Sequence, residues 1–324
     1  MKLKQTKPHL ISLALAFLAV VIAGCSDSSD PGNSSGDGGA DNFRLVATTG
    51  HINNALQRIT DGTDAEITLF CGPGVDPHSF SASTNHVQTM LDSDLIIYNG
   101  FHLEAKLSEH LHDTFEDKSW AMSSAFPEDQ RLDWVEDGQI DDEAPFDPHI
   151  WNNLPAWAVC VEGLADRLAE ADPDNADTYR SNAEEYVTEI NEAHEWAREQ
   201  LSTLPEDRRV LVSAHDAFNY FANNYNLEPL AVLGIGNDAE ADIRKMREVA
   251  ETICDKKIPA IFLESITNAK VTEALSEACD QRGWTVEIVE QPLYSDDLGE
   301  KEPYDTFLGA FRANVELIVT SLSQ

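Results

Sequence analysis

Positive charge is scarce in this sequence. Its 324 residues include 22 Lys and Arg against 58 Asp and Glu, for a formal net charge of −36 at pH 7. Nucleic acids and anionic membrane surfaces bind basic patches, so we exclude nucleic acid as a partner. Disorder of the whole chain is also excluded, because 42% of the residues are hydrophobic and can fill a core. We attribute the acidic excess mainly to a solvated or salt-adapted surface, with attraction of cations as a secondary effect.

Cysteine is also sparse, and its spacing excludes one kind of metal site. None of the five cysteines belongs to a CxxC pair, so a thiolate zinc cluster is not expected. Disulfides and buried free thiols both remain open for the cysteines in the body of the chain. Cys254 and Cys279 flank one predicted strand and are the first pair to test for a bond. The four cysteines are Cys71, Cys160, Cys254 and Cys279.

No hydrophobic run at the N-terminus is long enough for a typical spanning helix. The run Leu10–Gly24 falls short of the ~20 residues that a bilayer requires, and a basic segment precedes it. This pattern predicts an export signal over residues 1–24. Small residues directly before Cys25 resemble the bacterial lipobox, which implies that Cys25 is lipidated; an ordinary signal peptide with a coincidental cysteine is the alternative.

The segment that follows the signal predicts where the protein resides. Residues 25–42 are rich in Gly, Ser and Asp and cannot bury a hydrophobic face, so we predict a flexible tether. A lipid followed by a tether holds a globular body near a membrane without inserting it. We expect a protein of the periplasm or the cell surface that is lipid-anchored to a membrane; inner and outer membranes both remain open.

From residue 43 the chain alternates short β-type runs with helical patterns. The fold class that this predicts is α/β, with two lobes, each a mostly parallel sheet flanked by helices. In the first lobe, residues 43–171, strands are predicted at Arg44–Thr48, Glu66–Phe70 and Asp94–Tyr98, and helices at His51–Ile59, Asn85–Leu91 and Leu103–His112.

One long helix is predicted to join the lobes. Apolar residues recur at steps of three or four between Asp172-Pro173, a helix start signal, and Leu204-Pro205, a stop signal. We therefore place a linking helix at 172–204 and a second lobe at 205–324. In that lobe we predict strands at Arg209–Ser213, Pro229–Leu233, Ala260–Glu264 and Thr285–Val289, and helices at Asp216–Asn224, Glu240–Cys254, Asn268–Gln281 and Tyr304–Leu322.

Three histidines and one aspartate follow predicted strands or turns. His78 and His149 each end an Asp-Pro-His tripeptide, His215 follows a strand in SAHDAF, and Asp296 lies in YSDDLG. Binding sites in open α/β sheets gather at the carboxyl ends of the strands, so these four side chains are expected to lie close together. Three imidazoles and a carboxylate suit a borderline divalent ion such as Zn²⁺.

Six segments in this order resemble one known family. They are GPGVDPH, YNGFHLEAKL, FDPHIW, RRVLVSAHDAFNYF, IPAIFLES and LYSDDLG. Together they resemble the periplasmic metal-binding lipoproteins of zinc/manganese-type ABC transporters, the zinc-uptake component A family, over about residues 43–322. The resemblance implies a metal ion held in the cleft between two lobes by His78, His149, His215 and Asp296.

The resemblance also implies a function and partners. A monomeric solute-binding protein would capture Zn²⁺ or Mn²⁺, with Fe²⁺ also accepted by such ligands, and deliver it to an ABC transporter permease. We do not expect an enzyme, because no HExxH motif and no paired-metal carboxylate cluster is present. A zinc-dependent hydrolase that uses the same cleft and a surface adhesin or interaction lipoprotein are the alternatives.

Other residues are assigned supporting roles or remain open. A ligating imidazole usually donates its second N–H to a carboxylate, and Glu264 is the candidate acceptor in the second lobe. Asp76 and Asp147 are interpreted as turn caps. The resemblance implies that His102 belongs to the family's frame and is not a ligand, with a structural role or a role in supporting a ligand. The role of His51 and that of the 234–242 loop, which differs from many relatives, are left open.

Overall fold

The computed structural model describes residues 42–136, 139–140, 144–235 and 242–324. Residues 41–324 form one compact unit. The predicted export signal, Cys25 and all of the tether except its last residue lie outside the described residues. Among the helices of the described ranges, none combines the length and the hydrophobicity that a membrane-spanning helix needs.

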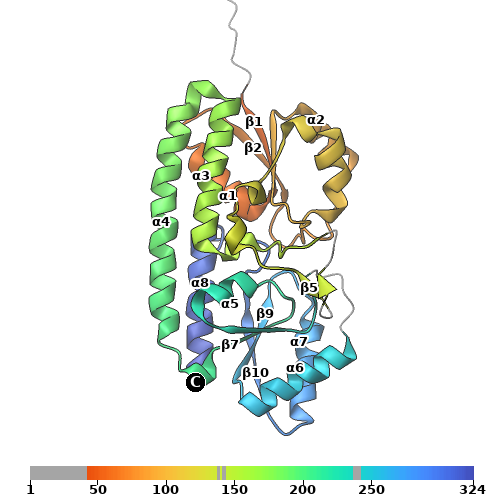
Figure 1. The fold of residues 1–324 in the computed structure, drawn as a ribbon. Coiled ribbons are helices and arrows are strands. Elements are labelled where there is room, and N and C mark those ends of the chain that lie inside the picture. The colour runs from red at the N-terminus through yellow and green to blue at the C-terminus, as the bar shows by residue number, and fades with distance from the viewer. Residues whose placement is uncertain (1–41, 137–138, 141–143, 236–241) are drawn as a thin grey trace, which may run out of the picture. The chain divides into compact units, whose positions relative to one another are not determined.

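The N-terminal lobe is built on a parallel sheet of four strands in the order β2-β1-β3-β4 (Figure 1). Successive residues of β1 point to opposite faces, and both faces are buried: Val46 packs in one hydrophobic cluster and Ala47 in another. The elements are β1 Arg44–Thr49, α1 Gly50–Ile59, β2 Glu66–Cys71, α2 Thr84–Asp92, β3 Leu95–Tyr98 and β4 Ser119–Ala121.

Two helices leave this lobe as an antiparallel pair, α3 (Leu154–Ala171) and α4 (Ala176–Ser202). A 3-10 turn at Pro173–Asn175 separates them. With 27 residues, α4 is about 40 Å long. It packs against α1 in the N-terminal lobe and against α5 and α8 in the C-terminal lobe, and Figure 1 shows it running beside both.

The C-terminal lobe contains two pairs of parallel strands, β7 with β8 and β10 with β9, and β7 lies beside β9. A small antiparallel hairpin, β5 with β6, precedes it. The elements are β5 Val135–Glu136, β6 Gln139–Ile140, β7 Val210–Ser213, α5 Asn219–Tyr225, β8 Glu228–Ala231, α6 Ile243–Lys256, β9 Ala260–Glu264, α7 Ala269–Asp280, β10 Glu287–Leu293 and α8 Phe307–Leu322. The predicted fold class is confirmed.

Several predicted helices differ in detail from the structure; α8, for example, begins at Phe307 instead of Tyr304. The helix predicted at Leu103–His112 is replaced by a 3-10 turn at Ala105–Leu107 and a π turn at His110–Thr114. Glu104 turns inward there to accept backbone N–H groups of the preceding turn, which competes with a regular helix start. Helix α5 begins three residues later than predicted, because the chain bends after His215.

One of the hydrophobic clusters extends through both lobes. Trp157 of α3 lies 5.9 Å from Phe307 of α8, and Phe311 of α8 lies 5.9 Å from Phe221 of α5, measured between ring centroids. All four rings belong to one buried cluster that also contains the inward face of α4. The lobes therefore share packed aromatic rings in addition to their covalent connections, which restricts their relative motion.

The cysteines of the described chain are all free thiols, and two of them are neighbours. Cys71, Cys160 and Cys279 are buried, and Cys254 is half-buried. The Cys254 Sγ lies 3.9 Å from the carbonyl oxygen of Cys279. Burial, followed by the neighbouring Cys254 thiol, raises the pKa of Cys279 to about 12. A bond between this pair stays a prediction.

We predict that Cys254 and Cys279 form a disulfide when the purified protein is exposed to an oxidising thiol–disulfide buffer. Because the two residues are 25 positions apart, closing this loop is expected to stabilise the fold by about 3 kcal/mol. Peptide mapping without reduction should find these two residues linked, and Cys71 and Cys160 serve as buried controls that alkylate after unfolding. Alkylation of all four cysteines would contradict the prediction.

Candidate metal centre

The N-terminal lobe contributes two histidines through short turns. His78 follows β2, and its backbone N–H donates to Asp76 Oδ1 at 2.9 Å. His149 precedes a 3-10 turn at Ile150–Asn152, and its backbone N–H donates to Asp147 Oδ1 at 2.9 Å. The same Asp-Pro-His tripeptide thus forms the same Asp-capped turn twice, and each turn fixes the backbone of a histidine.

The C-terminal lobe contributes a histidine and an aspartate from the carboxyl ends of two strands. His215 follows β7, and the Ser213 hydroxyl donates to its carbonyl oxygen at 2.9 Å. Asp296 follows β10. Parallel strands end at the same edge of a sheet, which brings these two residues into one region although they are far apart in sequence.

The structure brings together the four residues that the sequence singled out. The His78 and His149 Nε2 atoms are 3.3 Å apart. Asp296 Oδ2 lies 3.2 Å from His215 Nε2 and 3.4 Å from His78 Nε2, while its Oδ1 lies 3.5 Å from His149 Nε2. One nitrogen or oxygen atom from each residue lies within 4.8 Å of the others, so the group is compact enough to hold one metal ion.

The four side chains differ in their access to solvent. His149 and His215 are fully buried and Asp296 is 1% exposed. The side chain of His78 is 9% exposed. The side of the group formed by His78 is therefore the one that solvent reaches, and the other three side chains are held in a protein interior.

A carboxylate supports the imidazole of His215. His215 Nδ1 lies 2.5 Å from Glu264 Oε2. The other oxygen of Glu264 accepts the backbone N–H groups of Ala214 and His215, at 2.7 and 2.9 Å. The hydrogen bond of Nδ1 to Glu264 leaves Nε2 as the ring nitrogen that faces the other three residues, so Nε2 is the atom that can bind an ion once the ring is neutral.

The carboxylate of Asp147 binds the imidazole of His149 in the same way, and the sequence did not predict this contact. Its Oδ1 lies 2.8 Å from His149 Nδ1, and its Oδ2 accepts from the Asn219 side chain of the other lobe at 3.0 Å. The interpretation of Asp147 as a turn cap was therefore incomplete. The signal available in the sequence was its position two residues before a histidine, but Asp76 has the same position and binds the backbone of its histidine.

The charges within the group compensate one another. Burial alone lowers the pKa of His215, but the carboxylates of Glu264 and Asp296 outweigh it and hold this pKa well above the ordinary value. Burial alone raises the pKa of Asp296, but His215 and His149 hold it well below its usual range. The group is thus built to keep a buried carboxylate ionised among imidazoles.

His51, whose role the sequence left open, lies beside the group and outside it. Its ring stacks on Trp151 with centroids 4.6 Å apart and an angle of 14° between the planes. Burial lowers the pKa of His51 to about 3, so this ring stays neutral at ordinary pH. Trp151 in turn donates its indole N–H to the carbonyl oxygen of Ser295 at 2.8 Å, next to Asp296 and across the lobes.

The remaining candidates lie elsewhere. His102 and His112 line a separate cavity of the N-terminal lobe. Residues 236–241 of the 234–242 loop lie outside the described residues, as does Cys25. Among the described residues, the single group of His, Cys, Asp and Glu side chains that meets the geometry of a metal site is the one formed by His78, His149, His215 and Asp296.

Comparison with known proteins gives related sequences over almost the whole chain. The manganese-binding lipoprotein MntA of Bacillus subtilis is 33% identical over 311 residues, covering 95% of this chain and 97% of that protein. The zinc-binding protein TroA of Treponema pallidum is 35% identical over 291 residues, covering 89% of this chain and 92% of that protein.

Solved structures give the same result. The periplasmic zinc-binding protein TroA of Treponema pallidum superposes with a TM-score of 0.81 at 33% identity, covering 88% of this chain and all of that chain. The Fe(III)-bound YtgA of Chlamydia trachomatis superposes with a TM-score of 0.76 at 25% identity, covering 86% of this chain and 98% of that chain.

The match to a described family spans both lobes and all four residues of the group. Residues 45–321 match the family described as the periplasmic component A of the zinc-uptake complex. This match covers more than half of the chain, and both named relatives are more than 30% identical to it over most of their length. The chain belongs to the zinc-uptake complex component A family.

Proposed function

We propose that this protein captures a divalent transition metal ion, Zn²⁺ or Mn²⁺, between its lobes and delivers it to the permease of an ABC transporter. The observation that carries the proposal is the convergence of three imidazole Nε2 atoms and one carboxylate from two lobes. The proposed ligands are His78, His149, His215 and Asp296. The metal ion is the transported substrate of such a protein.

Capture is favoured over catalysis by the number and burial of the ligands. A catalytic zinc ion keeps an open position for water or substrate, whereas four protein ligands satisfy its usual coordination number. Three of the four ligands here are buried. We therefore infer that the bound ion is enclosed and later released, without acting on a second molecule in the cleft.

Relatives with different metals leave two main candidates for the ion. Imidazole and carboxylate ligands bind Zn²⁺ more tightly than Mn²⁺ in the Irving–Williams order. Both oxygens of Asp296 face imidazoles, Oδ2 toward His215 and Oδ1 toward His149. Two-oxygen binding by Asp296 would raise the coordination number to five, which Mn²⁺ and Fe²⁺ also accept. We propose Zn²⁺ or Mn²⁺, with availability in the cell deciding between them.

The proposed organisation follows from this function. We propose an N-terminal metal-binding lobe at 43–171, a linking helix at 172–204 and a C-terminal lobe at 205–324. A lipid on Cys25 and the tether over residues 25–42 would hold this body, as a monomer, close to the permease. The named relatives include lipoproteins and periplasmic proteins, which supports a location outside the cytoplasm.

Metal binding tests the proposal directly. Wild-type protein freed of metal should bind one Zn²⁺ or Mn²⁺ ion per chain in calorimetry, and His215→Ala should weaken binding by more than about 100-fold, since it removes a ligand as well as its supporting contact. His110→Ala, a histidine of the N-terminal lobe outside the group, is the matched control. Equal affinity of His215→Ala and wild type would contradict the proposal, and zinc-dependent ester or phosphate hydrolysis would favour an enzyme.

Glu264→Gln is expected to weaken metal binding by about 10–100-fold without unfolding the protein. The amide keeps the shape of the carboxylate but loses the negative charge that orients His215. Glu287→Gln, on the exposed end of β10, is the control for loss of one acid from the same lobe. Unchanged affinity for both Zn²⁺ and Mn²⁺ in Glu264→Gln would rule out the supporting role.

Metal binding is expected to change the angle between the lobes only modestly. Shared aromatic packing and the hydrogen bond from Trp151 to Ser295 already join the lobes beside the group, and α4 packs on both. Structures determined with and without metal, superposed on the N-terminal sheet, should differ mainly in the loops that carry the ligands. A large rigid rotation of the C-terminal lobe would show that this account of the linking helix is wrong.

A further inference from the structure

The turn that follows β3 has a strained backbone. Gly100, Phe101 and His102 have φ values of 85°, 48° and 66°, so three successive residues lie in the left-handed region. Residues that carry a side chain, here Phe101 and His102, rarely adopt this backbone conformation. It persists only where the surrounding structure enforces it. At Gly100 a side chain would also collide with Ser123, because an added Cβ would lie 2.0 Å from Ser123 Oγ. Something in the structure must hold this turn in place.

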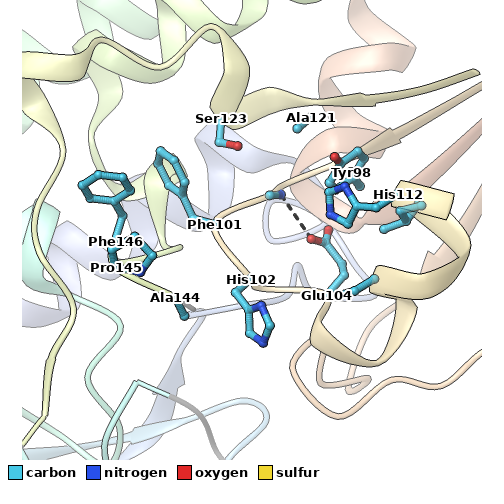
Figure 2. Close-up of a pocket in the computed structure, with 13 residues that line it drawn as sticks. Tyr98, Phe101, His102, Glu104, His112, Ala121, Ser123, Ala144, Pro145 and Phe146 are labelled. Atoms are coloured by element: carbon cyan, nitrogen blue, oxygen red, sulfur yellow. Dashed lines mark hydrogen bonds between the residues drawn. The ribbon is translucent and has the colours of Figure 1, made fainter. Parts of the chain in front are cut away.

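The Glu104 carboxylate accepts two backbone N–H groups at the start of this turn. Oε1 of Glu104 accepts the Thr48 hydroxyl at 2.6 Å and the Asn99 backbone N–H at 2.8 Å, and Oε2 accepts the Gly100 backbone N–H at 3.2 Å. Figure 2 shows this carboxylate directed at the backbone of the turn. Glu104 is 3% exposed. Burial raises its pKa and outweighs these hydrogen bonds, which act in the opposite direction.

The turn reaches the metal centre through Asn99. The fully buried Asn99 side chain donates to the carbonyl oxygen of Gly100 at 3.0 Å and to that of Pro148 at 2.8 Å. Pro148 directly precedes His149. The hydrogen bond to Pro148 therefore ties the end of β3 to the backbone of a proposed ligand.

A second contact joins the turn to the residue before Asp147. The rings of Phe101 and Phe146 lie 5.2 Å apart, and the Arg131 guanidinium lies 5.4 Å from each ring centroid. Both phenylalanines line the cavity of about 320 Å³ shown in Figure 2, with Glu104 on its wall. The turn thus contacts the chain on both sides of Asp147, at Phe146 and at Pro148.

We propose that Glu104 is a positioning residue for the metal centre. By fixing the strained turn at 99–102, it fixes residues 146–149, which present Asp147 and the His149 imidazole to the ion. This inference rests on the proposed metal-binding function and extends it to a carboxylate that does not touch the ion. The chain of contacts runs from Glu104 through Asn99 to Pro148 and His149.

Glu104→Gln tests this role, because the amide keeps the volume of the side chain and changes its hydrogen bonding. An NH₂ group in place of Oε2 would face the Gly100 N–H, so two donors would meet where a donor and an acceptor now pair. We expect Co²⁺, used as the spectroscopic probe, to bind about 10-fold more weakly. Its visible d–d absorption should also change, since the position of the His149 imidazole changes.

Asn99→Ala provides a second variant that leaves Glu104 intact. It removes the hydrogen bond to Pro148, so it should weaken Co²⁺ binding and alter the d–d absorption in the same direction. Ile96→Val is the control. Ile96 lies in β3 and packs in a different hydrophobic cluster from its neighbours Leu95 and Ile97, on the opposite face of the sheet. The substitution should lower the thermal midpoint while the Co²⁺ affinity and spectrum stay those of wild type.

The outcomes separate this inference from the proposed function. If wild type fails to bind Co²⁺, Zn²⁺ and Mn²⁺, the proposed function itself is wrong. If wild type binds and either Glu104→Gln or Asn99→Ala, folded, keeps wild-type affinity and spectrum, Glu104 has only a role in stability and the inference is overturned. If Glu104→Gln does not fold, Asn99→Ala decides by the same criteria.

Discussion

A buried carboxylate among three imidazoles is the interaction on which the rest of this structure depends. Asp296 is 1% exposed and lies within 3.5 Å of the Nε2 atoms of His78, His149 and His215. An unpaired buried charge is costly, so the fold must supply compensating groups from every side. Two of these groups come from the other lobe, and the arrangement therefore exists only when both lobes are in place.

The supporting carboxylates extend this principle outward from the centre. Glu264 binds His215 and the backbone around it, and Asp147 binds His149 and reaches Asn219 across the lobes. In His149 and His215, the contact of Nδ1 with a carboxylate leaves Nε2 as the nitrogen that faces an ion. The shared aromatic core and helix α4 contact both lobes and so hold the parts of this network that each lobe contributes in position.

Much of this arrangement could be predicted from the sequence, for physical reasons that are visible in particular residues. Buried β-branched runs located the strands, and the three-to-four spacing of residues such as Tyr179, Tyr186 and Ile190 located the long helix. The four residues of the group could be chosen because they follow turn signals or predicted strand ends, where binding sites gather in α/β folds. The six motifs in order, which resemble one family, pointed to the same residues.

The parts that could not be predicted depend on tertiary contacts. Nothing local distinguishes Asp147 from Asp76, since both precede a histidine by two residues and cap a turn; packing alone brings Asp147 Oδ1 to the imidazole of His149. Likewise the helical pattern after Leu103 did not indicate that the Glu104 side chain points inward and binds the backbone of a left-handed turn. Its partner Thr48 is 56 residues away in the sequence.

The central claim is that one metal ion binds where the two lobes meet. The most direct measurement is anomalous X-ray diffraction from crystals of the protein saturated with Zn²⁺. We expect one strong peak at the zinc edge, about 2.0–2.2 Å from the Nε2 atoms of His78, His149 and His215 and from a carboxylate oxygen of Asp296. A dominant peak at any other side chains, with these four residues unoccupied, would contradict it.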